Sequence, residues 1–145
     1  MIALLQRVSK ASVSVDGNII ARIDSGLLVF VGVQKNDREK QALRLSERIL
    51  GYRVFEDDRG RMNLSLSDTC GGLLLVPQFT LAADTDRGMR ASFTSAAAPD
   101  VASKLFELVA SSSANTHGKV LRGRFGADMQ VSLVNEGPVT FWLEC

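Results

Sequence analysis

Two short segments of the chain carry polar groups that could do chemistry on a substrate. The apolar residues 73–77 lead into Gln78-Phe79-Thr80, and the pattern predicts a strand over residues 73–81 with Gln78 and Thr80 on one face. The Thr80 hydroxyl could act as a nucleophile if a base lay beside it. Alternatively, backbone N–H groups around Phe79 could stabilise an oxyanion, the usual role of preorganised donors in acyl transfer.

The second segment is residues 135–140 (Asn-Glu-Gly-Pro-Val-Thr), between predicted strands over residues 129–134 and 139–143. Proline has no N–H and cannot lie inside a central strand, so Gly137-Pro138 must interrupt or turn the sheet. One interpretation is an ordinary hairpin turn. The other is a backbone corner, with a cis bond, that directs carbonyl oxygens away from its own sheet. The pattern alone leaves both open.

The side chains that most enzymes use for catalysis are not recognisable in the sequence. The single histidine, His117, lies in a Ser/Asn/Gly stretch and is expected to be exposed rather than catalytic. Neither a G-x-S-x-G segment nor a serine–histidine–acid constellation is present. His117, Cys70 and Cys145 have no metal-ligand spacing, and there is no phosphate-binding glycine loop. We therefore expect no metal and no cofactor. An active site would have to use backbone groups and threonine or glutamine side chains.

The composition is that of one globular domain, with 145 residues of which 46% are apolar and 23% charged. Two cysteines make no disulfide framework, which favours a reducing compartment. No apolar run reaches the ~20 residues of a membrane helix, and no secretory signal is visible, so a cytoplasmic location is expected. The net charge of +1 argues against a protein that coats nucleic acid by charge, and no DNA partner is predicted. The basic groups within residues 119–124 and at Arg87 and Arg90 are interpreted as solvated surface.

Hydrophobic periodicity predicts a mixed α/β (α+β) fold in a single domain over residues 1–145. One helix is expected from Asp37 to Gly51, and a second from Pro99, ending before a polar loop at residues 111–115. Strands are predicted over residues 2–8, 12–15, 18–23, 27–33, 52–56, 73–81, 119–124, 129–134 and 139–143, with residues 62–66 ambiguous. A mixed β-sheet with two helices on one side is the economical packing of this order.

Together, the segments around Gln78-Phe79-Thr80 and Gly137-Pro138 resemble the two signature motifs of the D-aminoacyl-tRNA deacylase family. The resemblance covers the full length of the chain. Four further blocks occur in the family's order: residues 1–8 (MIALLQRV), 51–55 (GYRVF), 86–90 (DRGMR) and 125–131 (FGADMQV). One departure is Pro77, where most members have serine. Because proline has neither a hydroxyl nor an N–H, any role for those groups is absent here.

The resemblance implies a three-layer β/β/α sandwich with largely antiparallel sheets and two helices, associated as a homodimer. It implies hydrolysis of the ester that joins a D-amino acid to the 3′-terminal adenosine of tRNA. In that scheme Gly137-Pro138, held cis, enters the pocket of the partner subunit, and its carbonyl groups bind the α-amino group of the substrate. An L-amino acid would be rejected because its side chain meets this corner, whereas glycine is small enough to enter.

The remaining site residues follow from the same resemblance. Arg7 is expected to brace the corner, and Met129 to pack near the adenine. Gln78, Phe79 and Thr80 are expected to line the pocket, with the Phe79 N–H positioning the ester. The 2′-hydroxyl of the tRNA would assist the attacking water. Two alternatives stay open: a non-catalytic tRNA-binding module of the same fold, and a hydrolase of small D-amino acid esters that does not require tRNA.

Overall fold

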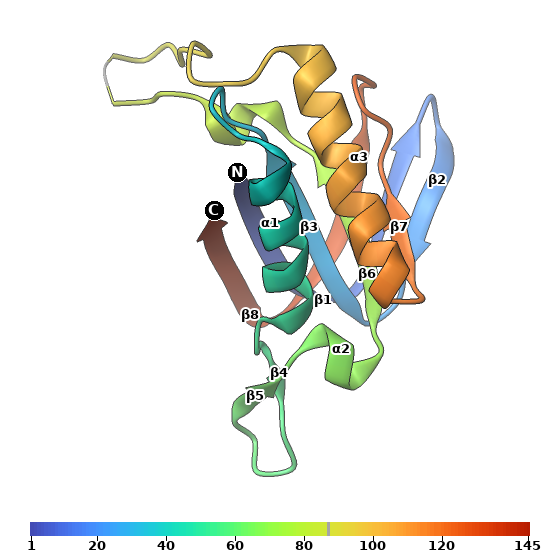
Figure 1. Cartoon of the computed structure of the whole chain (residues 1–145). Helices are drawn as coiled ribbons and strands as arrows, with labels where there is room; N and C mark the ends of the chain where they lie inside the picture. Colours follow the sequence, from blue (N-terminus) through green and yellow to red (C-terminus); the bar gives the residue numbers. More distant parts are fainter. Residues whose placement is uncertain (87) are drawn as a thin grey trace.

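Strand β1 (Ile2–Val15) organises the sheet in the computed structural model, which describes residues 1–86 and 88–145 (Figure 1). One edge of β1 pairs antiparallel with β8 (Gln130–Glu144) along nearly its whole length. The other edge pairs first with β3 (Gly26–Gly32) and then with β2 (Asn18–Ile23), both antiparallel. The prediction of two separate strands at residues 2–8 and 12–15 was wrong, because β1 continues through them and bends where its register with β8 shifts.

The bend places strands β3 and β6 (Gly72–Pro77) between two hydrophobic cores. These strands are parallel, and β7 (Val120–Arg122) continues the parallel pairing on the far edge of β6. Val29 and Leu75 face the first core, beneath the helices, whereas Leu28 and Leu74 face the second core, beneath the far halves of β1 and β2. The molecule is therefore a three-layer β/β/α arrangement of mostly antiparallel pairing, which confirms the predicted fold class.

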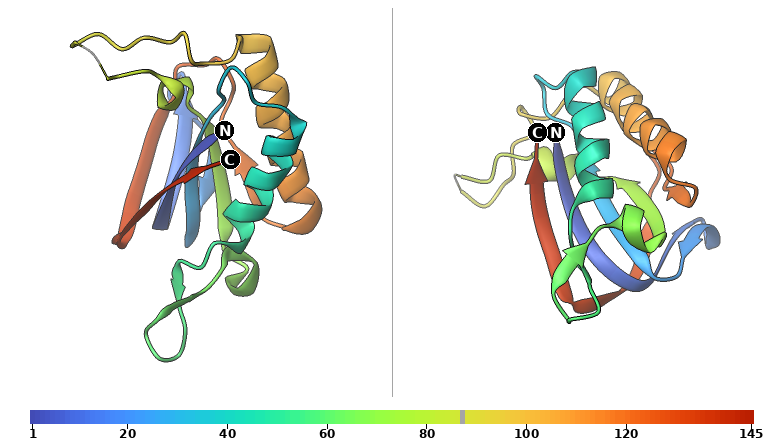
Figure 2. Two further views of the ribbon diagram at one scale, coloured as in Figure 1. Left: turned by 60° about the vertical axis from the view of Figure 1, so that its left-hand side comes forward. Right: turned by 60° about the horizontal axis from the view of Figure 1, so that its bottom comes forward.

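Helices α1 (Glu39–Gly51) and α3 (Pro99–Thr116) cover one face of the sheet (Figures 1 and 2). The helical spacing of Ala42, Leu45 and Ile49 predicts one apolar face, with Leu43 and Leu50 beside it; all of these residues are buried except Leu43, which is exposed. The helix begins two residues later than predicted because Asp37 has another role: its carboxylate accepts hydrogen bonds from the Met1 amino group (2.7 Å) and the Gln34 N–H (2.6 Å). Among the described residues, no helix is both long enough and apolar enough to cross a membrane.

Two predictions near the end of α3 were wrong. Residues 111–115 were expected to form a loop, but α3 continues to Thr116 because Ser113 faces inward and its hydroxyl lies 2.9 Å from that of Ser46 on α1. His117 was expected to be exposed. It is buried, and its Nε2 lies 2.7 Å from the Gly71 carbonyl oxygen. This histidine therefore joins the end of α3 to the start of β6, a structural role.

A small outlying unit follows α1. It contains the antiparallel pair β4 (Phe55–Glu56) and β5 (Met62–Leu64) and the short helix α2 (Leu66–Thr69). The predicted strand over residues 52–56 is thus confined to its last two residues. Arg87, which the sequence placed in a basic group with Arg90, lies outside the described residues.

Helix α2 begins with a capping box that makes one pH-dependent prediction. The Ser65 hydroxyl and N–H donate to the Asp68 carboxylate and hold the pKa of Asp68 below its ordinary value. Since the folded pKa is the lower one, the stabilisation is present above about pH 4 and is lost as the pH falls through the folded pKa. Urea unfolding should therefore show Asp68→Asn to be less stable than wild type at pH 7, with the difference vanishing in acid. A pH-independent difference would contradict this.

Candidate functional site

The Gln78-Phe79-Thr80 motif does not form the end of a strand, as the sequence predicted. Strand β6 stops at Pro77, and residues Phe79–Ala82 form a 3₁₀ helix, η1. The Gln78 N–H still donates to the Val31 carbonyl (2.8 Å), so Gln78 is the last residue tied to β3. Phe79 then starts the helix, and the first N–H groups of a helix have no partner within it. The Phe79 N–H is thereby presented as a free donor.

In the part of the chain that the structure describes, no hydrogen bond gives Thr80 the basic neighbour that a nucleophile needs. Its hydroxyl accepts a hydrogen bond from the Gln78 side-chain amide, and the residue is exposed. A nucleophilic hydroxyl requires an adjacent base. Among the hydrogen bonds of the described residues, none joins Thr80 to a histidine or a carboxylate. The geometry therefore gives Thr80 a contact with the Gln78 side chain.

A hollow of about 630 Å³ opens beside η1. Its walls are mainly apolar and aromatic, and they include Gln78, Phe79 and Met129. Phe79 and Phe93 pack with ring centroids 5.1 Å apart at the rim. A Cβ atom at Gly123 would lie 2.8 Å from the Met129 sulfur, so the absence of a side chain at Gly123 leaves room for the Met129 side chain. Such a hollow suits a flat ring system with few polar contacts.

Gly137-Pro138 lies in a protrusion from β8. The pairing of β8 with β1 steps from Thr140 opposite Gln6 to Asn135 opposite Val8, which leaves the intervening residues of β8 to bulge outward. The Gly137–Pro138 peptide bond is cis, and both residues are exposed. The sequence had predicted a break between two strands, whereas β8 is assigned as one strand through this point.

The side chain of Asn135 hydrogen-bonds to the backbone at the other end of the protrusion. This role was not predicted. Its side-chain oxygen accepts from the Val139 N–H (2.8 Å), and its amide donates to the Val139 carbonyl (3.2 Å). The two contacts close a ring across the intervening residues. Asparagine commonly bonds nearby backbone in turns, and this preference was the available signal in the sequence.

Arg7 fixes the protrusion to the body of the protein. It is buried, its Nε donates to the Glu136 carbonyl (2.9 Å), and its Nη1 donates to the Val54 carbonyl (2.7 Å). Glu56 lies farther away, 3.8 Å from Nη2, and is largely exposed. The guanidinium group therefore holds the peptide preceding Gly137, and its bracing of the corner in a substrate site stays a prediction.

Arg7→Lys should lower the free energy of unfolding by about 1.5–3 kcal/mol, because one ammonium cannot reproduce both buried hydrogen bonds of the fork. Urea denaturation would measure this. The matched control is Arg44→Lys, since Arg44 is exposed on α1 and forms an ion pair with the exposed Glu47 (2.9 Å). The change in its free energy of unfolding should stay within about 0.5 kcal/mol. Equal effects of the two substitutions would contradict the anchoring role.

The predicted site residues form two groups at opposite ends of the sheet. Gln78, Phe79 and Met129 share the hollow, with Thr80 next to it, whereas Arg7, Gly137 and Pro138 form the protrusion. Strand β3 spans the distance: its Leu27 pairs with Arg7, and its Val31 accepts from Gln78. Four strand residues correspond to about 13 Å. Figure 1 shows β8 turning at one end of the sheet, away from η1 at the other.

Within residues 1–86 and 88–145, no cluster of three or more His, Cys, Asp or Glu side chains is placed to hold a metal ion. The candidate chemistry consists of backbone donors at η1, backbone carbonyl groups at the protrusion, and the apolar hollow.

The comparison with known families makes this chain an ester hydrolase of the aminoacyl-tRNA type. The chain belongs to the D-Tyr-tRNA(Tyr) deacylase family, whose model matches residues 4–144. It is 65% identical over 144 residues to the D-aminoacyl-tRNA deacylase of Thioalkalivibrio sulfidiphilus (99% of this chain, 97% of the relative). It is 59% identical over 144 residues to that of Alkalilimnicola ehrlichii (99% and 96%). The protein is therefore an enzyme of this type.

Solved structures show the same fold. A c-Myc DNA unwinding element binding protein superimposes with a TM-score of 0.95 at 35% identity, over 100% of this chain and 99% of the other. A probable eukaryotic D-amino acid tRNA deacylase gives a TM-score of 0.86 at 17% identity, over 98% and 97% of the two chains. The second likeness concerns the fold alone.

Proposed function

We propose that this protein removes D-amino acids from tRNA in the cytoplasm, at a site that two copies of the chain complete. The observation that carries the proposal is the separation of the two motifs. The free Phe79 N–H and the exposed Gly137-Pro138 carbonyl groups suit opposite ends of one small substrate, yet they lie at opposite ends of the sheet. A second copy in antiparallel orientation would bring the protrusion of one subunit to the hollow of the other.

The face opposite the helices offers a surface for that association. Leu4 pairs across the sheet with Phe30 on one side and Trp142 on the other, so the three side chains form one apolar row. Trp142 is 52% exposed, and Phe79, at the same end of the sheet as the row, is 60% exposed. Leu4 and Phe30 are half-buried, so the row is exposed mainly at Trp142, and large exposed apolar side chains favour self-association. The C-terminal run of β8 would thereby supply both the protrusion and part of the interface.

In the proposed site each group has one task. The 3′-terminal adenosine occupies the hollow with Met129 near its adenine, and the Phe79 N–H donates to the ester carbonyl as negative charge develops. The carbonyl groups of the partner's Gly137 and the partner's Pro138 accept from the substrate α-amino group. An L-side chain would then point at this fixed backbone and be excluded. Glycyl-tRNA would be accepted, because glycine has no side chain.

The missing side-chain base is supplied by the substrate in this scheme. The 2′-hydroxyl of the terminal ribose lies next to the ester and assists the attack of water, and the proton passes to the departing 3′-oxygen. Pro77 takes no part, because it has no side-chain donor or acceptor. Thr80 holds the Gln78 amide and forms no bond with the substrate carbon.

The test of the proposed function is hydrolysis of matched D-Tyr-tRNA and L-Tyr-tRNA by purified protein. The D-ester should be cleaved at least roughly 100-fold faster, because rejection rests on a steric clash rather than on a lost contact. tRNA binding without cleavage would instead support a non-catalytic binding module. Equal rates on tRNA and on simple D-tyrosine esters would support a tRNA-independent esterase.

Thr80→Ala distinguishes a covalent mechanism, in which Thr80 is the nucleophile, from the attack of water assisted by the tRNA 2′-hydroxyl. We expect the variant to keep kcat within about tenfold of wild type, because only the contact to Gln78 is lost; deletion of a covalent nucleophile would remove activity far more severely. Single-turnover deacylation of D-Tyr-tRNA measures this directly. A loss of several orders of magnitude, with an unchanged circular dichroism spectrum, would restore Thr80 as the nucleophile.

A further inference from the structure

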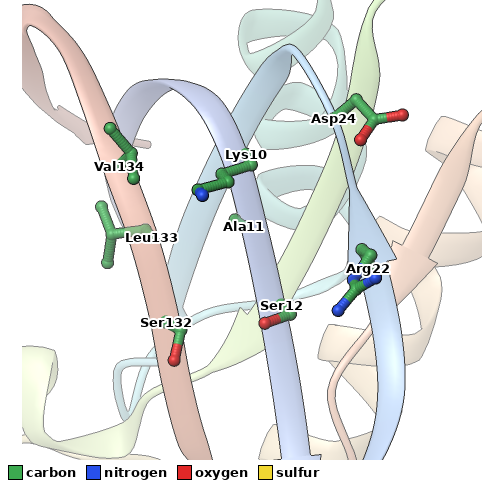
Figure 3. Close-up of a pocket in the computed structure, with 8 residues that line it drawn as sticks. All are labelled: Lys10, Ala11, Ser12, Arg22, Asp24, Ser132, Leu133 and Val134. Atoms are coloured by element: carbon green, nitrogen blue, oxygen red, sulfur yellow. The ribbon is translucent and has the colours of Figure 1, made fainter.

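A second hollow, of about 410 Å³, lies on the outer face of the folded-over half of the sheet (Figure 3). Three adjacent strands form its floor: β8, β1 and β2. Ser12 of β1 pairs across the sheet with Arg22 of β2 and with Ser132 of β8, so these three side chains form one row. Lys10 lies two residues before Ser12 and on the same face.

The hollow is a region of unneutralised positive charge. Neither Lys10 nor Arg22 has a carboxylate within ion-pair distance among the described residues, whereas Arg7, Arg44, Arg61 and Arg122 do. Asp24 is the one acidic residue of the lining, and in Figure 3 its carboxylate is turned away from Lys10. Two hydroxyl groups, from Ser12 and Ser132, lie in the row that contains Arg22. Two cations and two hydroxyl donors match a phosphodiester, which presents negative charge and only acceptors.

The outer hollow shares strand β8 with the hollow beside Phe79. Successive residues of a strand point to opposite faces, so Val131 lines the hollow beside Phe79, whereas Ser132 lines the outer hollow. One strand thickness therefore separates the two. A nucleotide chain whose last adenosine occupied the inner hollow would pass over β8 and reach Ser132, Lys10 and Arg22 with its next phosphates.

We propose that Lys10, Ser12, Arg22 and Ser132 form a phosphate-binding cradle for the acceptor strand of the tRNA substrate. The cradle rests on the proposed function and adds to it a means of distinguishing an aminoacyl-tRNA from a small aminoacyl ester. Phosphate contacts position a nucleic acid without reading its sequence, so the cradle serves tRNAs of every amino acid specificity. It also explains how a chain with a net charge of +1 holds RNA: the charge that matters is local.

The test compares Lys10→Ala/Arg22→Ala with the control Lys40→Ala/Lys104→Ala, which removes the same charge from exposed positions on the helical layer. The cradle variant should lower kcat/KM on D-Tyr-tRNA about tenfold, mainly through KM, and reduce the slope of log kcat/KM against log salt by about 1–2. Hydrolysis of 3′-O-D-tyrosyl-adenosine, which has no upstream phosphate, should be unchanged. The charge-preserving swap Lys10→Arg/Arg22→Lys should retain most of the salt slope.

Two results would overturn the cradle: equal effects of the two double variants, or an equal loss on tRNA and on the adenosine ester. Failure of the proposed function would look different, since wild-type protein would then cleave neither substrate. In that case uncharged tRNA is the probe. A smaller salt slope of binding in Lys10→Ala/Arg22→Ala alone would support the cradle, and identical slopes in both double variants would overturn it.

Discussion

Gly137→Ala should reduce hydrolysis of D-Tyr-tRNA by roughly 100-fold or more, because a misplaced group of this size costs that much in a preorganised site. A Cβ atom at Gly137 would lie 2.6 Å from the Val139 Cγ2 and 2.9 Å from the Val139 N. The backbone there has φ of +144°, a conformation that side chains rarely adopt. The protrusion must therefore shift, and its carbonyl groups move away from the substrate. Single-turnover kinetics would measure the loss.

Gly118→Ala is the matched control, because a Cβ atom at Gly118 meets nothing within 4 Å. Both variants should retain the circular dichroism spectrum of wild type, since Gly137 is exposed and outside both hydrophobic cores. Normal activity of Gly137→Ala would show that the protrusion takes no part in substrate binding. An equal loss in both variants would point to a general effect of the substitution rather than to the site.

Mixing two inactive variants should restore activity. Gly137→Ala damages the protrusion, and Phe79→Pro removes the N–H at the first position of η1, where proline is tolerated. In a mixed dimer, one of the two sites would combine an intact η1 from one subunit with an intact protrusion from the other. Random reassortment of equal amounts would return about a quarter of wild-type activity. Deacylation measured after co-refolding, beside each variant refolded alone, tests this.

Failure of the mixture to regain activity would place both halves of the site in one chain, provided that sedimentation shows mixed dimers to have formed. A monomeric protein with full activity would contradict the shared site outright. These outcomes differ from the loss expected for Gly137→Ala alone, which is the same whether the protrusion acts within its own subunit or in its neighbour.

Much of the fold could be predicted because local pattern and tertiary environment agree. The continuous apolar residues 27–33 correctly indicated a strand covered on both faces, and β3 lies between the two cores. Ala42, Leu45 and Ile49 recur at helical spacing, and they are buried on α1 for the same reason. Local pattern failed where a distant partner decided the outcome: Asp37 binds the Met1 amino group instead of capping α1, and Ser113 extends α3 by meeting Ser46.

The candidate site, like the fold, could be predicted only where local sequence was sufficient. Residue identities at Gln78, Phe79, Thr80, Gly137 and Pro138 could be read from the two motifs, but their backbone conformations could not. The apolar residues 73–77 suggested that the strand continued to residue 81, whereas Pro77 ends β6 and a 3₁₀ helix follows. Asn135 was overlooked because the preference of asparagine for nearby backbone does not by itself identify its partner, here Val139. The distance between the motifs required the fold.

The pairing of β1 with β8 has a consequence for how the protein is made. Ile2 pairs with Glu144, so one edge of the first strand stays unpaired until almost the whole chain has been synthesised. An unpaired strand edge invites association with other chains, and such distant pairing forms slowly. Arg7 is synthesised early, but it can anchor the protrusion only after Glu136 has left the ribosome. The protrusion at Gly137-Pro138 is therefore assembled last, and a chain halted before that point has the hollow without the protrusion.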